Sequence, residues 1–210
     1  MASSPRSYDT NVFVNCPFDS EYKPIFDAVT FAIHDAGFRA RTALEENNTA
    51  TERHSKIARL IKECKYGIHD ISRVETDPAS GLPRLNMAYE CGLFYGAQLF
   101  GSGIQKAKEI LVLDTEPFRY HRTMSDIAGK DAAAHDNDPP TAIAHVRRFL
   151  TNKERGALRG ASVMQKRYQD FLADLPAIAG NMSCTLDELQ SLDYWREYVI
   201  AAVEWIKTHP

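Results

Sequence analysis

The spacing of apolar and polar positions predicts short strands alternating with amphipathic helices over residues 11–114. Apolar runs rich in β-type residues predict four strands, at 11–15, 38–44, 66–71 and 109–114. Segments with apolar residues at helical spacing lie between them, at 24–36, 53–62 and 86–100. Such an alternation predicts an α/β fold in which a doubly wound parallel sheet of four or five strands is covered by helices on both faces.

The pattern weakens after the fourth strand and then becomes helical. Residues 117–138 are polar and irregular, with a short strand or helix expected near 124–128. A helix is expected to open at Thr141, and two more amphipathic helices follow in the tail, the second behind a capping box of Thr185 and Glu188. We therefore expect an α/β domain over residues 1–155 and a helical extension over 156–210. The aromatic stripe of the tail would either pack on the sheet domain or serve as a docking or dimerisation surface.

Composition excludes several classes of protein. The chain has 210 residues, 44% hydrophobic and 25% charged, as in ordinary globular proteins. Its net charge of −3 gives no electrostatic reason to expect nucleic-acid binding. A basic segment at 53–65 alternates with apolar residues at helical spacing, which indicates a solvated helix face. Scattered cysteines, the absence of a long apolar run and a start without a signal-peptide core predict a cytoplasmic protein with no membrane segment.

The most informative stretch is 85–105, in which Glu90 is the only charged residue. A helix that is apolar nearly all round is buried on most sides, and an unpaired buried carboxylate costs several kcal/mol. A structural ion pair with Arg84 or Arg53 would offset that cost. The functional alternative is a carboxylate in the first helical turn, at the sheet edge where open α/β folds bind ligands. Gly92 and Gly96 would let this helix approach a neighbouring element closely.

Other polar residues converge on the same edge of the predicted sheet. Asn15, Glu45, Asp70 and Asp114 stand at or just after the ends of the four strands. Glu45 and Asp114 are typical of helix caps or ion pairs, whereas Asp70 is a candidate catalytic residue. Three residues are candidate phosphate or ribose contacts that could equally be surface or capping residues: Arg53, Arg84 and Asn86.

The segment Pro83-Arg84-Leu85-Asn86-Met87-Ala88-Tyr89-Glu90-Cys91-Gly92, continuing to Gly96, resembles the N-x-x-x-E-x-G-x-x-x-G helix of nucleoside 2-deoxyribosyltransferase-like proteins and is similar to bacterial TIR-like nucleotide-binding proteins. The order of the first strand, the 53–62 helix and the strand ending at Asp70 agrees, so the likeness covers about residues 10–150. It implies a flavodoxin-like fold in which Glu90 acts on the anomeric carbon of a ribose or deoxyribose. Asp70 would bind substrate or assist the leaving base.

The resemblance also bears on substrate and setting. TIR-like members hydrolyse or cyclise NAD, often as effectors of bacterial anti-phage defence, and deoxyribosyltransferases exchange or remove nucleobases. Phe18 and Tyr22 are the candidates here for the aromatic pocket of these families, and Asn15 is a further candidate substrate contact. The helical tail has no counterpart in these families. We expect homo-oligomers or assembly with a defence-system partner.

The combined expectation is cleavage of an N-glycosidic bond in NAD or a related nucleotide or nucleoside. NAD would be the substrate, and no cofactor or metal is expected. Asp126, Asp131 and His135 match no known metal spacing and are expected to be solvated loop residues. A non-catalytic nucleotide sensor and a TIR-type interaction module are the alternatives on the same fold.

Overall fold

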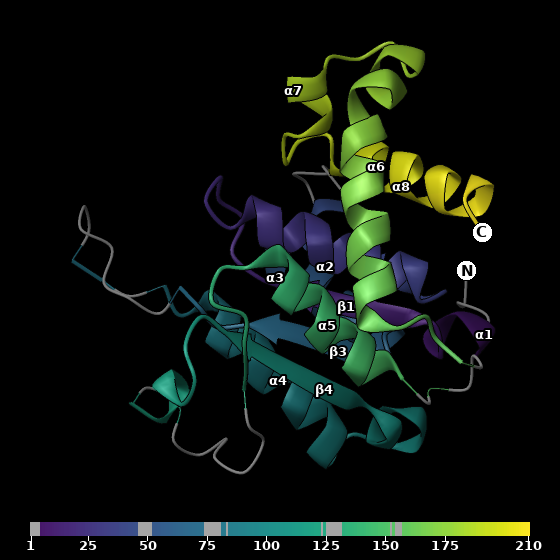
Figure 1. The fold of residues 1–210 in the computed structure, drawn as a ribbon. Coiled ribbons are helices and arrows are strands. Elements are labelled where there is room, and N and C mark those ends of the chain that lie inside the picture. Colours follow the sequence, from purple (N-terminus) through teal and green to yellow (C-terminus); the bar gives the residue numbers. More distant parts are fainter. Residues whose placement is uncertain are drawn as a thin grey trace. The chain divides into compact units, whose positions relative to one another are not determined.

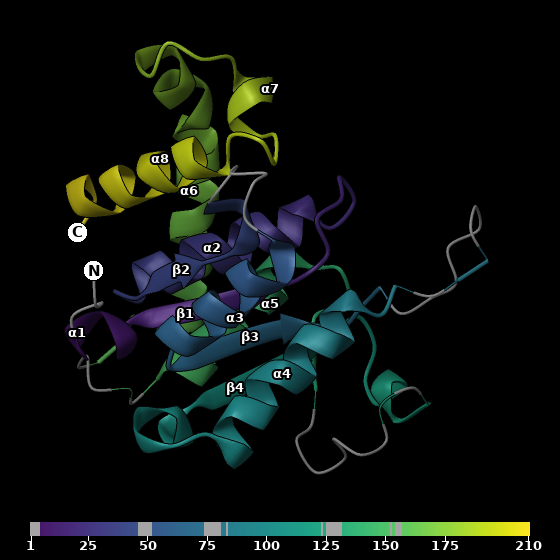
Figure 2. The ribbon, with the colours of Figure 1, turned by 180° about the vertical axis from the view of Figure 1, so that it is seen from behind.

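The computed structural model describes residues 5–45, 52–73, 81–82, 84–122, 124, 132–151, 153 and 157–210. The chain forms two compact units (Figures 1 and 2). The first contains residues 1–17, 40–43 and 48–137, and the second contains residues 18–39, 44–47 and 138–210. This division differs from the expected one at residue 155, because two helices from the expected α/β domain, at 23–35 and 139–150, group with the tail.

A five-stranded sheet confirms the α/β fold class. The strands are β1 (Asn11–Asn15), β2 (Arg39–Arg41), β3 (Tyr66–Asp70), β4 (Glu109–Asp114) and β5 (Ala133–Ala134). Their order is β2-β1-β3-β4-β5, which is the flavodoxin-like order. The pairs β1–β3, β3–β4 and β4–β5 are parallel, with Asn15 opposite His69 and Asp70 opposite Leu113. The strand expected at 38–44 is only three residues long. The fifth strand, at 133–134, comes after the stretch 124–128 where a short strand or helix was expected; most of that stretch lies outside the described residues.

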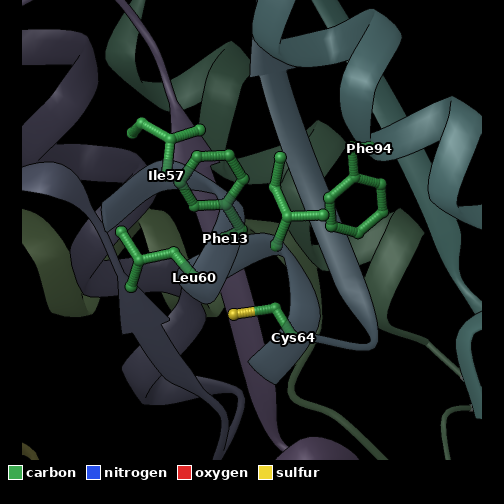
Figure 3. Close-up of a cluster of buried hydrophobic side chains, with 6 residues drawn as sticks. Phe13, Ile57, Leu60, Cys64 and Phe94 are labelled. Atoms are coloured by element: carbon green, nitrogen blue, oxygen red, sulfur yellow. The ribbon is translucent and has the colours of Figure 1, made fainter. Parts of the chain in front are cut away.

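Two helices of the first unit, α3 (Arg53–Glu63) and α4 (Asn86–Phe100), lie over the same face of the sheet (Figure 2). The apolar stripe of α3 meets Phe13 of β1 and Phe94 of α4 (Figure 3). The basic side of α3 is largely exposed, as expected for a solvated face. Short helices α1 (Pro5–Tyr8), η2 (Gly103–Ala107) and η3 (Arg119–Arg122) complete the unit.

A buried lysine closes the end of α3. Lys108 is 1% exposed, and its Nζ donates to the carbonyls of Ile61, at 2.5 Å, and Cys64. The same ammonium lies 4.3 Å from the centre of the Phe94 ring. A cation at the carboxyl end of a helix satisfies the last carbonyls and complements the helix dipole. Lys108 therefore joins the end of α3 to α4 and to the start of β4.

The second unit is helical. It contains α2 (Lys23–Asp35), α5 (Pro139–Leu150), α6 (Ala161–Asn181), α7 (Leu186–Leu189) and α8 (Trp195–Thr208), and η1 (Ala43–Glu45) enters it in part. Phe31 of α2 contacts three rings of the tail, those of Tyr168, Phe171 and Trp205. The aromatic stripe of the tail is thus packed against α2, which explains why α2 groups with the tail.

Several expected details of the helices are changed in the structure. The capping box of Thr185 and Glu188 is present, but the helix behind it is a single turn, and α8 begins separately at Trp195. Helix α5 begins at Pro139, with the side chain of Asp138 accepting from Thr141 N. Asn86, expected to cap α4, is instead its first residue; Leu85 precedes it without a side-chain capping bond.

Candidate active site around Glu90

Helix α4 turns Glu90 toward the interior of the first unit. Its buried residues, Met87, Glu90, Cys91 and Phe94, follow helical spacing and form one face. The Glu90 side chain is 11% exposed. Because α4 begins at Asn86, Glu90 lies in the second turn, and our expectation of a first-turn carboxylate favoured by the helix dipole was wrong. Burial, rather than the dipole, governs its charge.

The only ion pair that the described residues give Glu90 is weak. A guanidinium nitrogen of Arg53 lies 4.0 Å from Oε1, and the Arg53 side chain is 66% exposed. Exposed pairs at this distance contribute about 0–1 kcal/mol. Burial raises the pKa of the Glu90 carboxyl above its ordinary value, and Arg53 lowers it only in part. Glu90 is therefore a buried carboxylate whose charge is incompletely compensated.

Asn15 ties the end of β1 to the start of α4. Its Nδ2 donates to the Met87 carbonyl at 2.8 Å and contacts Nδ1 of His69 at 3.0 Å. Nδ1 of His69 therefore accepts, which places the ring proton on Nε2. Burial, together with nearby Lys108, lowers the pKa of His69 to about 3, so the ring is neutral. Asn15, a predicted substrate contact, therefore uses one amide hydrogen to hold the start of α4 and the other to hold His69 of β3.

His69 can pack closely against α4 because residue 67 of β3 is a glycine. A Cβ on Gly67 would lie 2.6 Å from Nε2 of His69 and 2.9 Å from Cζ of Phe94. His69 meets the rings of Phe13 and Phe94 edge-on, at 5.7 and 5.0 Å between centroids. This close packing fixes the neutral imidazole between the sheet and α4.

Asp70 belongs to a different group of polar side chains. Its Oδ1 accepts from Ser72 N at 2.8 Å, and its Oδ2 lies 2.9 Å from Nε2 of His135. Asn137 N donates to Nδ1 of His135, so Nε2 carries the proton and donates to Asp70. Because neighbouring strand residues point to opposite faces, Asp70 faces away from His69 and α4. His135 is fully buried, so the expectation of a solvated loop histidine was wrong.

Asp114 and Arg119 extend this second group. Arg119 is paired with Asp114 and donates to the carbonyl of Ser72 at 2.6 Å. Burial raises the pKa of Asp114, while Arg119 and Thr115 N lower it and Asp70 raises it. The ion pair agrees with the expected role of Asp114. Arg119, His135 and Lys108 were not predicted as site or network residues, since nothing in their local spacing marks a buried partner.

The remaining predicted contacts are dispersed. Arg84 and Asn86 are exposed beside the start of α4. Phe18 and Tyr22 belong to the second unit, where Phe18 packs edge-on against Phe26 and Tyr22 is buried before α2. Asp126 and Asp131 lie outside the described residues. Among the residues that are described, no three His, Cys, Asp or Glu side chains are grouped so as to hold a metal ion.

Two cavities of the second unit are lined by described residues alone, and Glu90 lines neither of them. One of about 400 Å³ lies between α6 and α8, and the other, of about 270 Å³, is lined by Lys23, Asp27 and Tyr168 among others. In the latter, Lys23 and Asp27 are paired at 2.5 Å, and burial raises the pKa of Asp27 to about 6.

Comparison with known proteins assigns no family to the chain, so its function has to be argued from the geometry of the site. No family model, curated protein or solved structure matches the chain. In the part of the chain that the structure describes, no helix combines the length and apolar character needed to cross a membrane.

Proposed function

We propose that the chain cleaves an N-glycosidic bond in NAD or a related nucleotide or nucleoside, with Glu90 as the catalytic carboxylate. The observation that carries the proposal is the burial of Glu90 on a helix without other charges, 4.0 Å from an exposed arginine. A fold rarely retains a buried carboxylate that lacks a close partner unless the charge is used. The resemblance of this helix to that of nucleoside 2-deoxyribosyltransferase-like and TIR-like proteins points to the same residue.

The chemistry requires an anion beside the sugar. As the bond between C1′ and the base nitrogen breaks, its electron pair leaves with the base, and positive charge develops on C1′ and the ring oxygen. Glu90 would stabilise that charge or form a covalent ester with C1′. Water then attacks C1′ and loses a proton; where an ester has formed, its bond to C1′ breaks and the electron pair returns to the carboxylate of Glu90. An anion held in surroundings poor in water interacts strongly with such a charge.

The neighbours of Glu90 suit a phosphorylated substrate. Arg53 is exposed and points a guanidinium nitrogen toward Oε1 of Glu90, so it could bind a phosphate of a nucleotide seated on the carboxylate. His54 follows Arg53 in α3, and its Nε2 lies 3.2 Å from the hydroxyl of Tyr89, which is on the outer side of α4. Arg53 is therefore the group beside the carboxylate that can contact a phosphate.

The surroundings of Asp70 favour NAD among the candidate substrates. A neutral nucleoside needs a proton on its leaving base, whereas nicotinamide leaves NAD as a neutral molecule without one. The oxygens of Asp70 are engaged by Ser72 and His135, on the face of β3 opposite His69. A mechanism with one carboxylate therefore fits this site better than one with a second residue as general acid.

The proposed setting is the cytoplasm, since Cys16, Cys64 and Cys91 are buried and not joined in disulfides, which suits a reducing compartment. A role as an effector of anti-phage defence rests on the resemblance alone and is part of the proposal.

The test incubates the purified protein, at several concentrations, with NAD, nucleosides and deoxynucleotides. Chromatography then measures the free base that is released. We expect nicotinamide from NAD and at least about a hundredfold loss of its release in Glu90→Gln. Glu63→Gln is the matched control, because Glu63 is half-buried in the same unit and paired with Arg41 at 3.2 Å. It should retain activity. Full activity of Glu90→Gln would refute the proposal, and NAD binding by calorimetry without turnover would make the chain a nucleotide sensor.

A further inference from the structure

The side of α4 that faces away from Glu90 is an exposed apolar surface. We define the α4 outer face as Leu85, Tyr89, Gly92, Gly96, Leu99 and Phe100. Its large side chains are all more than half exposed, at 60% for Leu85, 56% for Tyr89, 52% for Leu99 and 88% for Phe100. The intervals from Leu85 to Leu99 are four, three, four and three residues, the spacing of a seam between two helices.

The two glycines have no role in packing within the described chain. A Cβ at Gly92 or at Gly96 would meet nothing within 4 Å, so the close approach expected of them does not occur inside the molecule. Glycine in a helix interior costs about 1 kcal/mol relative to alanine. Two such residues, one turn apart on an exposed face, are explained if another helix lies against them.

The α4 outer face is also uncharged and large enough for self-association. Glu90 is the only charged residue from 85 to 105, and it is buried on the inner face. Two copies can thus meet without like-charge repulsion, as an isologous contact requires. The four large side chains of this face expose an apolar area on the order of 500 Å². Two copies would therefore bury about 1,000 Å² in total, which is the lower bound for a specific interface.

We propose that the α4 outer face is the contact of a two-fold dimer of this chain, with Gly92 and Gly96 where the two helices cross. The proposal does not depend on the role of Glu90. Because α4 carries Glu90 on one face and the dimer contact on the other, association would hold the helix that positions the carboxylate.

Sedimentation velocity over a concentration series tests the proposal. We expect the wild-type chain to reach twice its monomer mass at or below about 100 µM. Phe100→Glu should raise the dissociation constant at least about tenfold. The matched controls are Val163→Glu and Ile200→Glu, because these residues of α6 and α8 are also exposed, at 49% and 56%. Both controls should dimerise like the wild type.

Cross-linking locates the contact without relying on affinity. Three native cysteines are buried and Cys184 is half-buried. Gly96→Cys places an accessible thiol near the two-fold axis, where two copies can come within the roughly 7 Å between Cα atoms that a disulfide allows. Mild oxidation should yield a covalent dimer of Gly96→Cys and none of Ile200→Cys. A wild-type chain that stays monomeric, or a dimer that Phe100→Glu leaves intact, overturns the proposal.

Discussion

Replacing Glu90 by glutamine keeps the shape of the side chain and removes its charge, so the variant measures what the carboxylate costs the fold. The charge is 11% exposed, and its partner lies at 4.0 Å on a side chain that is 66% exposed. At that distance the attraction is about 1 kcal/mol in water and about 4 kcal/mol at an effective dielectric constant of 20. The raised pKa of Glu90 indicates that burial outweighs the attraction.

We therefore expect Glu90→Gln to be more stable than the wild type at neutral pH, by about 1 kcal/mol. For a chain of this size that corresponds to a rise of about 2–4 °C in Tm. The pKa of Glu90 is raised in the folded state above its ordinary 4.5, so the folded wild type loses stability as pH rises from 4.5 through the raised value. The advantage of the variant should be nearly absent below the ordinary pKa of 4.5 and should grow as the pH rises through the raised pKa of Glu90.

Thermal unfolding followed by circular dichroism at a series of pH values gives this comparison directly. Arg53→Ala serves as a companion variant and should change stability by less than about 1 kcal/mol, since the pair is exposed. If Glu90→Gln instead loses about 3 kcal/mol or more at neutral pH, Glu90 is one half of a structural ion pair. That outcome would support the structural explanation of the sequence pattern and remove the reason for assigning Glu90 to catalysis.

Two further variants probe the scaffold of the site. Gly67→Ala should destabilise the protein by about 1–3 kcal/mol in urea unfolding, because its Cβ would meet His69 and Phe94; Gly180→Ala, with open space at its Cβ, should be neutral or stabilising, and equal effects would contradict the packing described. Lys108→Met should cost about 2–4 kcal/mol because it leaves the buried carbonyls of Ile61 and Cys64 without their donor, whereas an unchanged midpoint would mean that Lys108 does not hold the end of α3.

The sheet was predictable because its signal is local. Strands β1, β3 and β4 are short, largely apolar runs, and strands that alternate with helices are expected to be parallel. The helix around Glu90 was predictable for the same reason, although Asn86 is its first residue rather than its cap, which moves Glu90 from the first turn to the second. The grouping of α2 with the tail was not predictable. Nothing in the sequence around Phe31 indicates that it contacts Tyr168, Phe171 and Trp205. Contacts over such separations depend on the packing of whole helices.

The polar residues at the strand ends show a similar limit. Parallel strands do bring Asn15, Asp70 and Asp114 to one edge, as expected. Which face of the sheet each side chain takes depends on register, and one residue of difference reverses the face. Asn15 lies opposite His69, so both face α4, while Asp70, one residue later, turns toward His135. A prediction that lists strand ends without their faces therefore merges two separate groups.

This separation bears on the chemistry. If Glu90 and Asp70 acted on one sugar, they would have to reach it from opposite faces of β3, and Asp70 would have to give up its bonds with Ser72 and His135. Breaking a buried, charge-assisted hydrogen bond costs about 1.5–3 kcal/mol, which such a mechanism would have to recover in the transition state. A leaving group that departs neutral requires neither the movement nor the proton. The alternation of side chains along β3 therefore supports the proposal of NAD, rather than a neutral nucleoside, as the substrate.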